Sequence, residues 1–264
     1  METREFNYKG KKLFYRIKGK GPLLVLLHGF GEDGTIWNHQ ADLFPNNHVL
    51  IPDLPASGKS EAIDDMSMEG LADAVKAMVE NQPAILIGHS MGGYISLAFA
   101  ERYPELLRAF GLFHSSAFAD SDEKKETRAK GIRFIEEHGA GAFLQTATPN
   151  LYAPDSKEQH PEWIEEHIAQ VHNFSAQNLV SYYKAMMQRP DRTAVLKESP
   201  VPVLFVMGQH DTAVPLQDGL KQCYLPQLAY IHILEAAGHM GMIEEKEKTA
   251  RLLTQFVNTI EITA

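Results

Sequence analysis

The sequence predicts an α/β fold with a doubly wound, mostly parallel eight-stranded sheet and a helical insertion. Short apolar runs alternate with helix-like segments through residues 1–114 and 200–264, which is the pattern of parallel strands joined by helices. The interval 115–199 breaks this alternation, because it holds helical patterns and no good strand. At 264 residues with 44% hydrophobic residues, the chain is long enough for one such core with an insertion.

The expected strands are short apolar runs, many of them bounded by Gly, Pro or polar residues. They lie near residues 4–8, 11–18, 22–27, 47–51, 84–88, 107–113, 201–207 and 228–234. The first two flank Lys9-Gly10-Lys11 and are expected to form an antiparallel hairpin. Helices are expected near 35–44, 67–81, 91–103, 216–223 and 242–259.

The insertion is expected to be mainly helical. Asp120-Ser121-Asp122-Glu123 is a helix start, and the helix is expected over Lys124–His138, ending at Gly139-Ala140-Gly141. A loop-rich middle with Pro149, Pro154 and Pro161 follows, then helices from Pro161 to about Val171 and from Ser175 to Met187. Arg189–Thr193 is expected to be a tight return loop.

Ser90 is the candidate nucleophile. The apolar run Ala84–Ile87 leads into Gly88-His89-Ser90-Met91-Gly92-Gly93, and a helix-like segment follows. This order of strand, sharp turn and helix exposes a serine hydroxyl above the edge of a sheet. The alternative is a glycine-rich packing turn in which the serine is incidental.

Two residues downstream supply the acid and the base that a serine nucleophile requires. Asp211 follows the strand Val201–Gly208, and His239 follows the strand near 228–234. Ligand sites form at the carboxyl ends of parallel strands, so we predict that Ser90, Asp211 and His239 form a catalytic triad. Asp211 could instead cap a turn, and His210 is the rival base beside it. An acid after the strand ending near Phe113 is disfavoured, because that position offers His114-Ser115-Ser116.

The loop after the strand Leu23–Leu27 reads His28-Gly29-Phe30-Gly31. Acyl transfer needs N–H donors for the oxyanion of a tetrahedral intermediate. The backbone N–H groups of Met91 and Phe30 are the predicted oxyanion hole. His28 is expected to fix the loop rather than to act as a second base.

With these motifs in place, the chain resembles the α/β-hydrolase family, in particular its small esterase, lactonase and C–C-bond-hydrolase branch. The resemblance rests on His28–Gly31, Asp53–Ser60, Gly88–Gly93, Gly208–Pro215 and Gly238-His239, in the family's order and spacing. Ala56-Ser57 departs from the Gly that this branch usually has there. The resemblance implies that residues 1–114 and 200–264 form the hydrolase core and that 115–199 form a cap. Trp163 and Met186 are the trial positions for its pocket-facing side.

The predicted function is hydrolysis of a small carboxylic ester or lactone through an acyl-enzyme, with no cofactor and no metal. Perhydrolysis, a lyase reaction or C–C-bond hydrolysis on the same triad are alternatives, because one fold serves many reactions. A protein that keeps the triad to bind a small ligand is another.

Composition limits the partners and the compartment. The net charge of −9 argues against a nucleic-acid or anionic membrane surface. No apolar run approaches the length of a membrane span, and the N-terminus lacks the apolar core of a signal peptide. Cys223 is the single cysteine, so no intrachain disulfide forms and a cytoplasmic location is expected. The sequence carries no signal for the oligomeric state.

Overall fold

The computed structural model describes residues 1–170 and 174–263. The eight expected strands are all present, within two residues of the expected bounds. They are β1 (Glu2–Tyr8), β2 (Lys11–Lys18), β3 (Leu23–Leu27), β4 (His48–Asp53), β5 (Ala84–His89), β6 (Leu107–Phe113), β7 (Val203–Gly208) and β8 (Ala229–Leu234).

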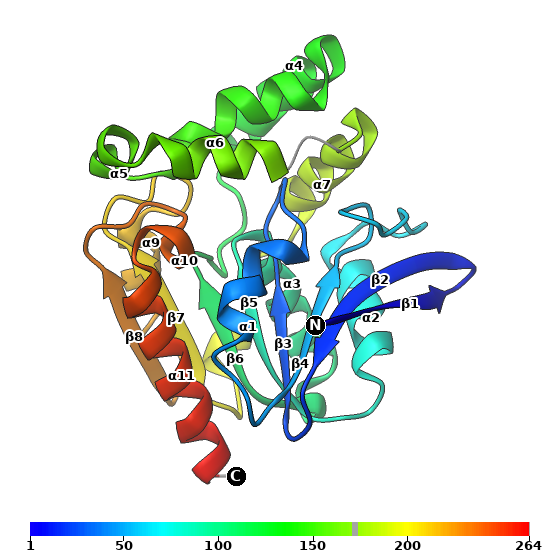
Figure 1. Cartoon of the computed structure of the whole chain (residues 1–264), viewed down its shortest axis with the longest axis vertical. Coiled ribbons are helices and arrows are strands. Elements are labelled where there is room, and N and C mark those ends of the chain that lie inside the picture. Colours follow the sequence, from blue (N-terminus) through cyan, green and yellow to red (C-terminus); the bar gives the residue numbers. More distant parts are fainter. Residues whose placement is uncertain (171–173, 264) are drawn as a thin grey trace.

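The strands form one sheet in the order β1-β2-β4-β3-β5-β6-β7-β8. β2 pairs antiparallel with both β1 and β4, and every other neighbouring pair is parallel. The predicted fold class is therefore confirmed. Because β3 to β8 run in the same direction, their carboxyl ends meet at one edge, below the helices α4 to α7 in Figure 1.

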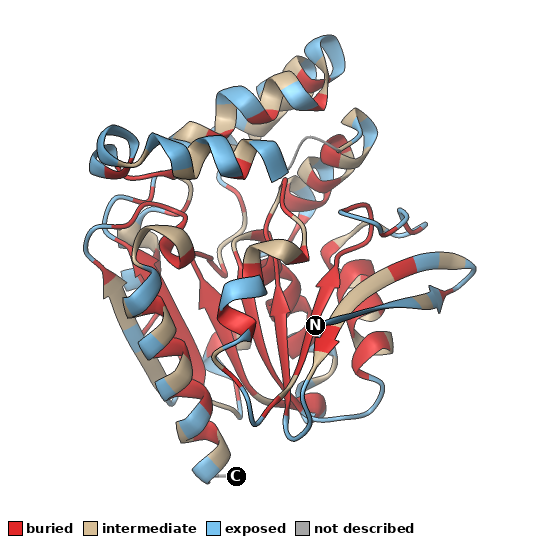
Figure 2. Cartoon of the chain, viewed as in Figure 1, coloured by how far each residue is buried: buried red, intermediate tan, exposed pale blue. Residues whose placement is uncertain are grey.

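Both faces of the central sheet are buried, as the red strands of Figure 2 show. In β3, Leu23, Val25 and Leu27 pack in the core cluster shared with α2 (Met68–Val79) and α3 (Met91–Arg102). Leu24 and Leu26 point the other way, into the cluster shared with α11 (Lys246–Thr263). Burial on both faces explains why the strands are continuous apolar runs rather than alternating ones.

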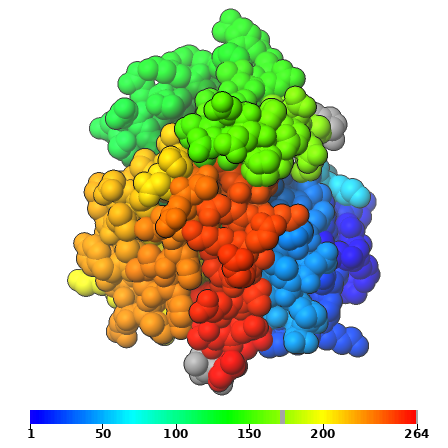
Figure 3. Space-filling view, turned by 60° about the vertical axis from the view of Figure 1, so that its left-hand side comes forward, coloured from blue at the N-terminus to red at the C-terminus, as the bar shows by residue number. Residues whose placement is uncertain are grey.

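The segment between β6 and β7 is helical in its described residues and sits on the carboxyl edge of the sheet, as the green upper lobe of Figure 3. Its elements are α4 (Asp122–Ala147), the 3₁₀ turn η3 (Thr148–Leu151), α5 (Pro154–Gln159), α6 (Pro161–Gln170), α7 (Ala176–Gln188) and α8 (Thr193–Lys197). The predicted end of the α6 helix, Val171, lies outside the described residues. Helix α5 lies in the stretch expected to be loop-rich, and α8 begins at Thr193, the last residue of the expected return loop.

Helix α4 differs from the expectation beyond Gly139. That glycine has φ 84° and ψ 165° and interrupts the helix, as the sequence predicts, but the chain returns to helical geometry and continues to Ala147. Ala140 and Leu144 are buried on the resumed turns. The second glycine, Gly141, lies within the helix. Because Ala140 and Leu144 are buried, the turns after the break add an apolar face to the helical segment.

Three other helices are shorter or split. The segment expected near 35–44 is a 3₁₀ turn η1 (Gly34–Trp37) followed by α1 (Asn38–Ala41), and the helix expected near 216–223 is α9 (Leu216–Leu220). The helix expected over 242–259 is divided into α10 (Gly241–Glu244) and α11 at Glu245, whose φ and ψ are −124° and 56°. A further 3₁₀ turn, η2 (Pro104–Leu106), precedes β6.

The loop after β4 docks on the helical segment. Ala56 has φ 77°, a left-handed conformation that favours glycine, at the position where the resembled branch has Gly. Its carbonyl accepts a hydrogen bond from Asn178 Nδ2 (2.9 Å), and Ser57 Oγ hydrogen-bonds the Tyr182 hydroxyl (2.8 Å). Through these contacts the loop after β4 supports α7.

Candidate active site

Ser90 lies at the turn between β5 and α3 with φ 51° and ψ −114°, a strained conformation for a residue with a side chain. A Cβ on Gly88 would lie 2.2 Å from the backbone of Gly92, so only glycine fits there. The end of β6 holds the turn: Ser90 N–H donates to Phe113 O (2.9 Å), and Ser115 Oγ donates to Ser90 O (2.7 Å). The expected order of strand, sharp turn and helix is thus present around Ser90, and its role as nucleophile stays a prediction.

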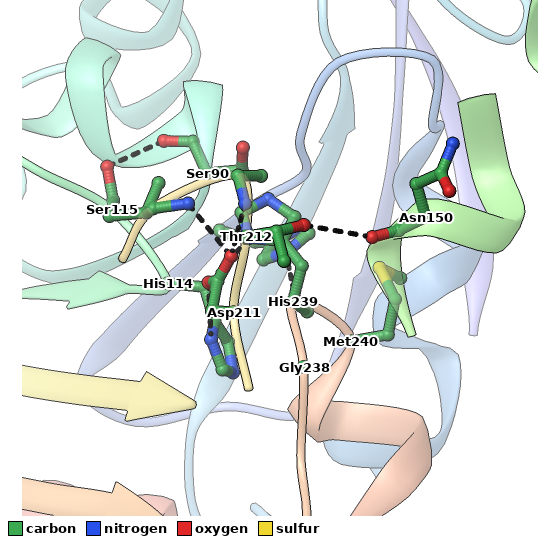
Figure 4. A network of polar contacts seen from close by, with 12 residues as sticks. Ser90, His114, Ser115, Asn150, Asp211, Thr212, Gly238, His239 and Met240 are labelled. Atoms are coloured by element: carbon green, nitrogen blue, oxygen red, sulfur yellow. Dashed lines mark hydrogen bonds and ion pairs between the residues drawn. The ribbon is translucent and has the colours of Figure 1, made fainter. Parts of the chain in front are cut away.

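Asp211 and His239 are brought together from the ends of β7 and β8 (Figure 4). His239 Nδ1 lies 2.8 Å from Asp211 Oδ2. The other carboxylate oxygen accepts the N–H groups of Ala213 (2.9 Å) and Val214 (2.8 Å). Burial would raise the pKa of Asp211, but the charge of His239 and the hydrogen bonds from His114 and His239 lower it well below its usual range. Asp211 is therefore an ionised carboxylate that orients His239.

Ser90 and His239 line one cavity of about 500 Å³. Asp211 lies buried behind His239 and does not line it. Since Nδ1 of His239 is engaged by Asp211, Nε2 is the ring nitrogen left for proton exchange with a reacting group in the cavity. This division of the two nitrogens is what a general base needs.

His114 is a second donor to Asp211, a role that the sequence did not predict. Its Nδ1 lies 3.2 Å from Asp211 Oδ2, and its Nε2 is buried without a hydrogen-bond partner among the described residues. Burial lowers the pKa of His114 to about 4, although Asp211 acts in the opposite direction. His114 is therefore neutral at pH 7 with its hydrogen on Nδ1. Its position directly after β6 was the available signal.

We expect His114→Phe to lower kcat/KM for an ester by about tenfold, because a hydrogen bond to a charged group contributes roughly 1.5–3 kcal/mol and Asp211 keeps three other donors. The ratio of kcat/KM between the variant and the wild type at pH 7 and pH 8 measures the effect. An unchanged kcat/KM would mean that the contact does not help to orient Asp211.

Of the two predicted oxyanion donors, Phe30 lines the cavity and Met91 directly follows Ser90, which also lines it. The N–H groups of Phe30 and Met91 donate to no acceptor within the described part of the chain, which leaves both available for a ligand. The Phe30 ring stacks on Tyr183 of α7, with centroids 4.3 Å apart and planes at 7°. A Cβ on Gly29 would lie 3.2 Å from the Cβ of Ser90, so the loop that carries Phe30 approaches Ser90 closely. The role of the Phe30 and Met91 N–H groups as an oxyanion hole stays a prediction.

A buried ion pair, His89 with Glu32, joins the loops of the site. His89 Nδ1 lies 2.9 Å from Glu32 Oε2, and its Nε2 lies 3.0 Å from the backbone oxygen of His239. Glu32 Oε2 also accepts the N–H of Gly29 (2.6 Å). Because both partners of the ring accept hydrogen bonds, both ring nitrogens carry hydrogen, and His89 is an imidazolium.

The pKa shifts agree with this assignment. Burial would raise the pKa of Glu32, but the charge of His89 lowers it to about 2. Burial would lower the pKa of His89, but Glu32 raises it above its usual value. Neither residue was predicted as part of the site, since their partnership spans 57 positions of the sequence.

We expect Glu32→Gln to destabilise the protein most between about pH 4.5 and 6.5, the unperturbed pKa values of the two groups. Glu32 has a lowered pKa, so its contribution is present above its unfolded pKa and is lost as the pH falls toward about 2. His89 has a raised pKa, so its contribution is present below its unfolded pKa and is lost as the pH rises through its folded pKa. Urea unfolding of both proteins across this range measures the difference. A difference that does not vary with pH would contradict the ion pair.

The loop that carries His239 is also tied to the helical segment. The N–H of His239 donates to Leu151 O (2.6 Å). Glu244 accepts the N–H groups of Gly238 (2.8 Å), Met240 (3.1 Å) and Ala153 (2.7 Å). Ala153 lies between η3 and α5, so the Glu244 carboxylate joins the loop that carries His239 to the helical segment.

The other candidate residues divide clearly. His28 is structural, because its Nδ1 contacts Gly29 O (2.8 Å) and its Nε2 accepts the Leu54 N–H (3.0 Å). His210 is exposed beside the buried Asp211. Met186 of α7 lines the cavity. Trp163 was expected to face the pocket, but it does not line the cavity. Its ring stacks on that of His160, with centroids 4.0 Å apart.

The three residues His114, Asp211 and His239 place potential metal ligand atoms within 4.8 Å of one another, the one such group found among residues 1–170 and 174–263. Both histidines use Nδ1 to hydrogen-bond the same carboxylate. A nitrogen that donates a hydrogen cannot at the same time bind a metal, so only Nε2 of each ring would remain for one.

A sequence model of a family described as "Alpha/beta hydrolase family" matches residues 24–252. A 2-hydroxy-6-oxononadienedioate/2-hydroxy-6-oxononatrienedioate hydrolase of Burkholderia vietnamiensis is 26% identical, over 93% of this chain and 91% of the relative. A pimeloyl-[acyl-carrier protein] methyl ester esterase of Methylococcus capsulatus is also 26% identical, over 93% and 98%.

Solved structures are similar over nearly the whole chain. A thermophilic esterase from Thermogutta terrifontis has a TM-score of 0.90 at 26% identity, covering 98% of this chain and 99% of that one. The enol-lactonase from Burkholderia xenovorans has a TM-score of 0.87 at 24% identity, covering 97% and 100%, and shows the likeness of fold. Among the described helices, none is both long and apolar enough to cross a membrane.

Proposed function

The chain belongs to the α/β-hydrolase family, and from this we propose that it is a serine hydrolase that cleaves a small carboxylic ester or lactone through an acyl-enzyme. Its membership and its esterase relatives make it a hydrolase that acts on ester bonds. The observation that carries the finer proposal is the Asp211–His239 hydrogen bond of 2.8 Å beside a cavity that Ser90 also lines.

In the proposed mechanism, Ser90 Oγ attacks the substrate carbonyl carbon while His239 Nε2 takes the serine proton. The resulting oxyanion is held by the N–H groups of Phe30 and Met91. Asp211 stabilises the imidazolium, and its own charge does not change. As the intermediate collapses, the bond from carbon to the leaving oxygen breaks and His239 returns the proton to the alcohol. Water, deprotonated by His239, then releases the acid from Ser90.

Covalent labelling tests the proposal. A fluorophosphonate probe should modify Ser90 of the native protein and leave the other serines unmodified, as peptide mass spectrometry can show. A chromogenic ester should also give a burst of phenol on rapid mixing if deacylation is slower than acylation. Labelling at another serine, or labelling without any ester turnover, would contradict the proposed function.

Cleavage of a C–C bond on the same residues is the second candidate. One relative is named a hydrolase of a 2-hydroxy-6-oxo dioate, and that name does not denote an ester. Product analysis separates the two reactions, because ester hydrolysis yields an acid and an alcohol, whereas hydrolysis of a C–C bond beside a ketone yields an acid and a second fragment whose carbon gains a hydrogen. Perhydrolysis would instead appear as halogenation that depends on peroxide and an organic acid. Tight binding with slow turnover would indicate a small-ligand receptor.

The helical segment 115–199 is proposed to act as a cap that excludes water and shapes the substrate pocket. Its Leu144 lies over the oxyanion loop, since a Cβ on Gly31 would be 2.8 Å from Leu144 Cδ2. Its Leu151 accepts the N–H of His239 (2.6 Å). Residues of α4, η3, α6 and α7 line the cavity together with Ser90.

We expect Met186→Ala to change the preference for acyl-chain length, because Met186 lines the cavity and its truncation enlarges it. Trp163→Ala is the matched control, since its ring packs on His160 outside the cavity. The measurement is kcat/KM for acetyl through octanoyl esters. Should Met186→Ala lower every chain length by the same factor, Met186 would not shape the acyl pocket.

A further inference from the structure

One stretch of the cavity wall is cationic. The first turns of α4 place Lys124, Thr127 and Arg128 on the wall of the cavity that holds Ser90 and His239. The side chain of Arg128 is only 13% exposed. An arginine so far removed from water needs an anionic partner, and its partners decide whether its charge is already neutralised.

Two arginines share one carboxylate at this wall. Arg128 Nε lies 2.7 Å from one oxygen of the buried Asp120, and Arg189 Nη1 lies 2.8 Å from the other. Arg189 is otherwise held by structure: it donates to Met186 O (2.7 Å) and Phe118 O (3.0 Å) and is absent from the cavity wall. The cluster of three groups therefore keeps one positive charge, and Arg128 is its member on the cavity.

Lys124 adds a second charge. Its Nζ donates to the neutral carbonyl of Ala213 (2.8 Å), and it forms no ion pair within the described residues. The carboxylates at the cavity do not offset it: Glu123 is exposed, Asp218 contacts Lys221 (3.4 Å), and Glu32 is paired with His89. The part of the wall that the first turns of α4 form thus has an excess of positive charge, although the whole chain carries −9.

The pKa of Tyr94, which also lines the cavity, is shifted by the same positive charges. Burial would raise the pKa of its hydroxyl, but the charges of Arg189, Lys124 and Arg128 outweigh burial and lower that pKa. The opposing charge of Asp120 is the weaker influence. A negative charge is therefore favoured at this wall.

Arg128 is also held in a fixed place relative to the reacting centre. Its guanidinium lies over the ring of Tyr183, 5.4 Å from the centroid, and Tyr183 stacks on Phe30 of the predicted oxyanion loop. Its Nη1 makes no hydrogen bond to any described residue. A planar donor group with an open N–H edge is suited to a carboxylate.

We propose that the substrate carries a carboxylate remote from its scissile carbonyl and that Arg128, assisted by Lys124, binds this group. The substrate class is then a half-ester of a dicarboxylic acid or a carboxylated lactone. This inference rests on the proposed function, because it places the carboxylate in the same cavity as the reacting carbonyl. Simple alkyl esters would be turned over as poorer substrates.

The test compares matched esters that differ only in one charge. The substrates are p-nitrophenyl hydrogen esters of dicarboxylic acids from adipate to suberate, each beside its methyl-capped neutral form. For the best chain length, wild-type kcat/KM should be at least tenfold higher for the anion. Arg128→Gln should reduce that ratio by about 10- to 100-fold, since a hydrogen bond between charged groups contributes roughly 1.5–3 kcal/mol. Asp120 keeps Arg189 in this variant, so no carboxylate is left unpaired.

Two variants complete the design. Lys124→Met should reduce the same ratio by a smaller factor, because Lys124 assists. Arg133→Gln is the matched control on the exposed side of α4 and should leave the ratio unchanged. A wild type that prefers the neutral ester at every chain length, or an equal loss for both esters in Arg128→Gln, would overturn the inference.

A binding measurement separates this inference from the proposed function. Ser90→Ala protein should bind monomethyl adipate at least tenfold more tightly than dimethyl adipate in a calorimetric titration at pH 7. If no ester is hydrolysed by the wild type, the proposed function fails and this titration still decides the carboxylate site. If neutral esters are hydrolysed but binding shows no preference for the anion, only the carboxylate site fails.

Discussion

Replacing Ser90 by alanine should lower kcat/KM for ester hydrolysis by about a thousandfold or more, because removal of one triad member abolishes the covalent route. Folding should be retained, since alanine meets the same backbone strain at φ 51° as serine does. The measurement is steady-state hydrolysis of an activated acetate, with urea unfolding of both proteins.

Ser181→Ala on α7 is the matched control, because its hydroxyl only hydrogen-bonds Gln177 O within the helix (2.9 Å) and does not reach the cavity. Its activity should stay within about twofold of the wild type, as for most surface substitutions. If Ser90→Ala retains more than about a tenth of the wild-type activity, Ser90 is not the nucleophile.

His239→Ala should match Ser90→Ala within about tenfold, because members of a triad act as a unit and their losses do not add. His210→Ala is the matched control: it lies 29 positions earlier, beside Asp211, and is exposed. It should keep most of the activity. The measurement is kcat/KM for the same activated acetate.

His28→Ala should also keep substantial turnover, with reduced stability, because the variant leaves the Leu54 N–H without its acceptor. A loss in His210→Ala as large as that in His239→Ala would instead identify His210 as the base. The acid loop after β7 would then need a different role, since Asp211 contacts His239 and not His210.

The predictable part of this fold follows from local chemistry. The central strands are apolar runs because both faces of the sheet are buried, and each run is delimited by residues that end a strand. Ser90, Asp211 and His239 could be proposed together because each follows such a run, and parallel strands bring their carboxyl ends to one edge. No knowledge of distant contacts was needed for that step.

The partners of these residues depend on contacts that a sequence does not encode locally. His114 and Glu32 reach the site across 97 and 57 positions, and many histidines and glutamates have the same local surroundings. Trp163 was misplaced because helical periodicity defines a face but does not say which neighbour that face meets. The continuation of α4 beyond Gly139 likewise brings Leu144 close to Gly31, a contact between residues far apart in the sequence.

The ties between His239 and residues 151–153 limit how this enzyme can be recombined with its relatives. Leu151 O accepts the N–H of His239, and Glu244 links the same loop to Ala153. A chimera that exchanges the whole of 115–199 would replace both Leu151 and Ala153, the residues of this segment that hold the His239 loop. An exchange limited to α4 and α7 would change cavity-lining residues and leave Leu151 and Ala153 in place. Within the helical segment, α4 and α7 can thus be exchanged, whereas residues 151–153 must be kept together with the core that they contact.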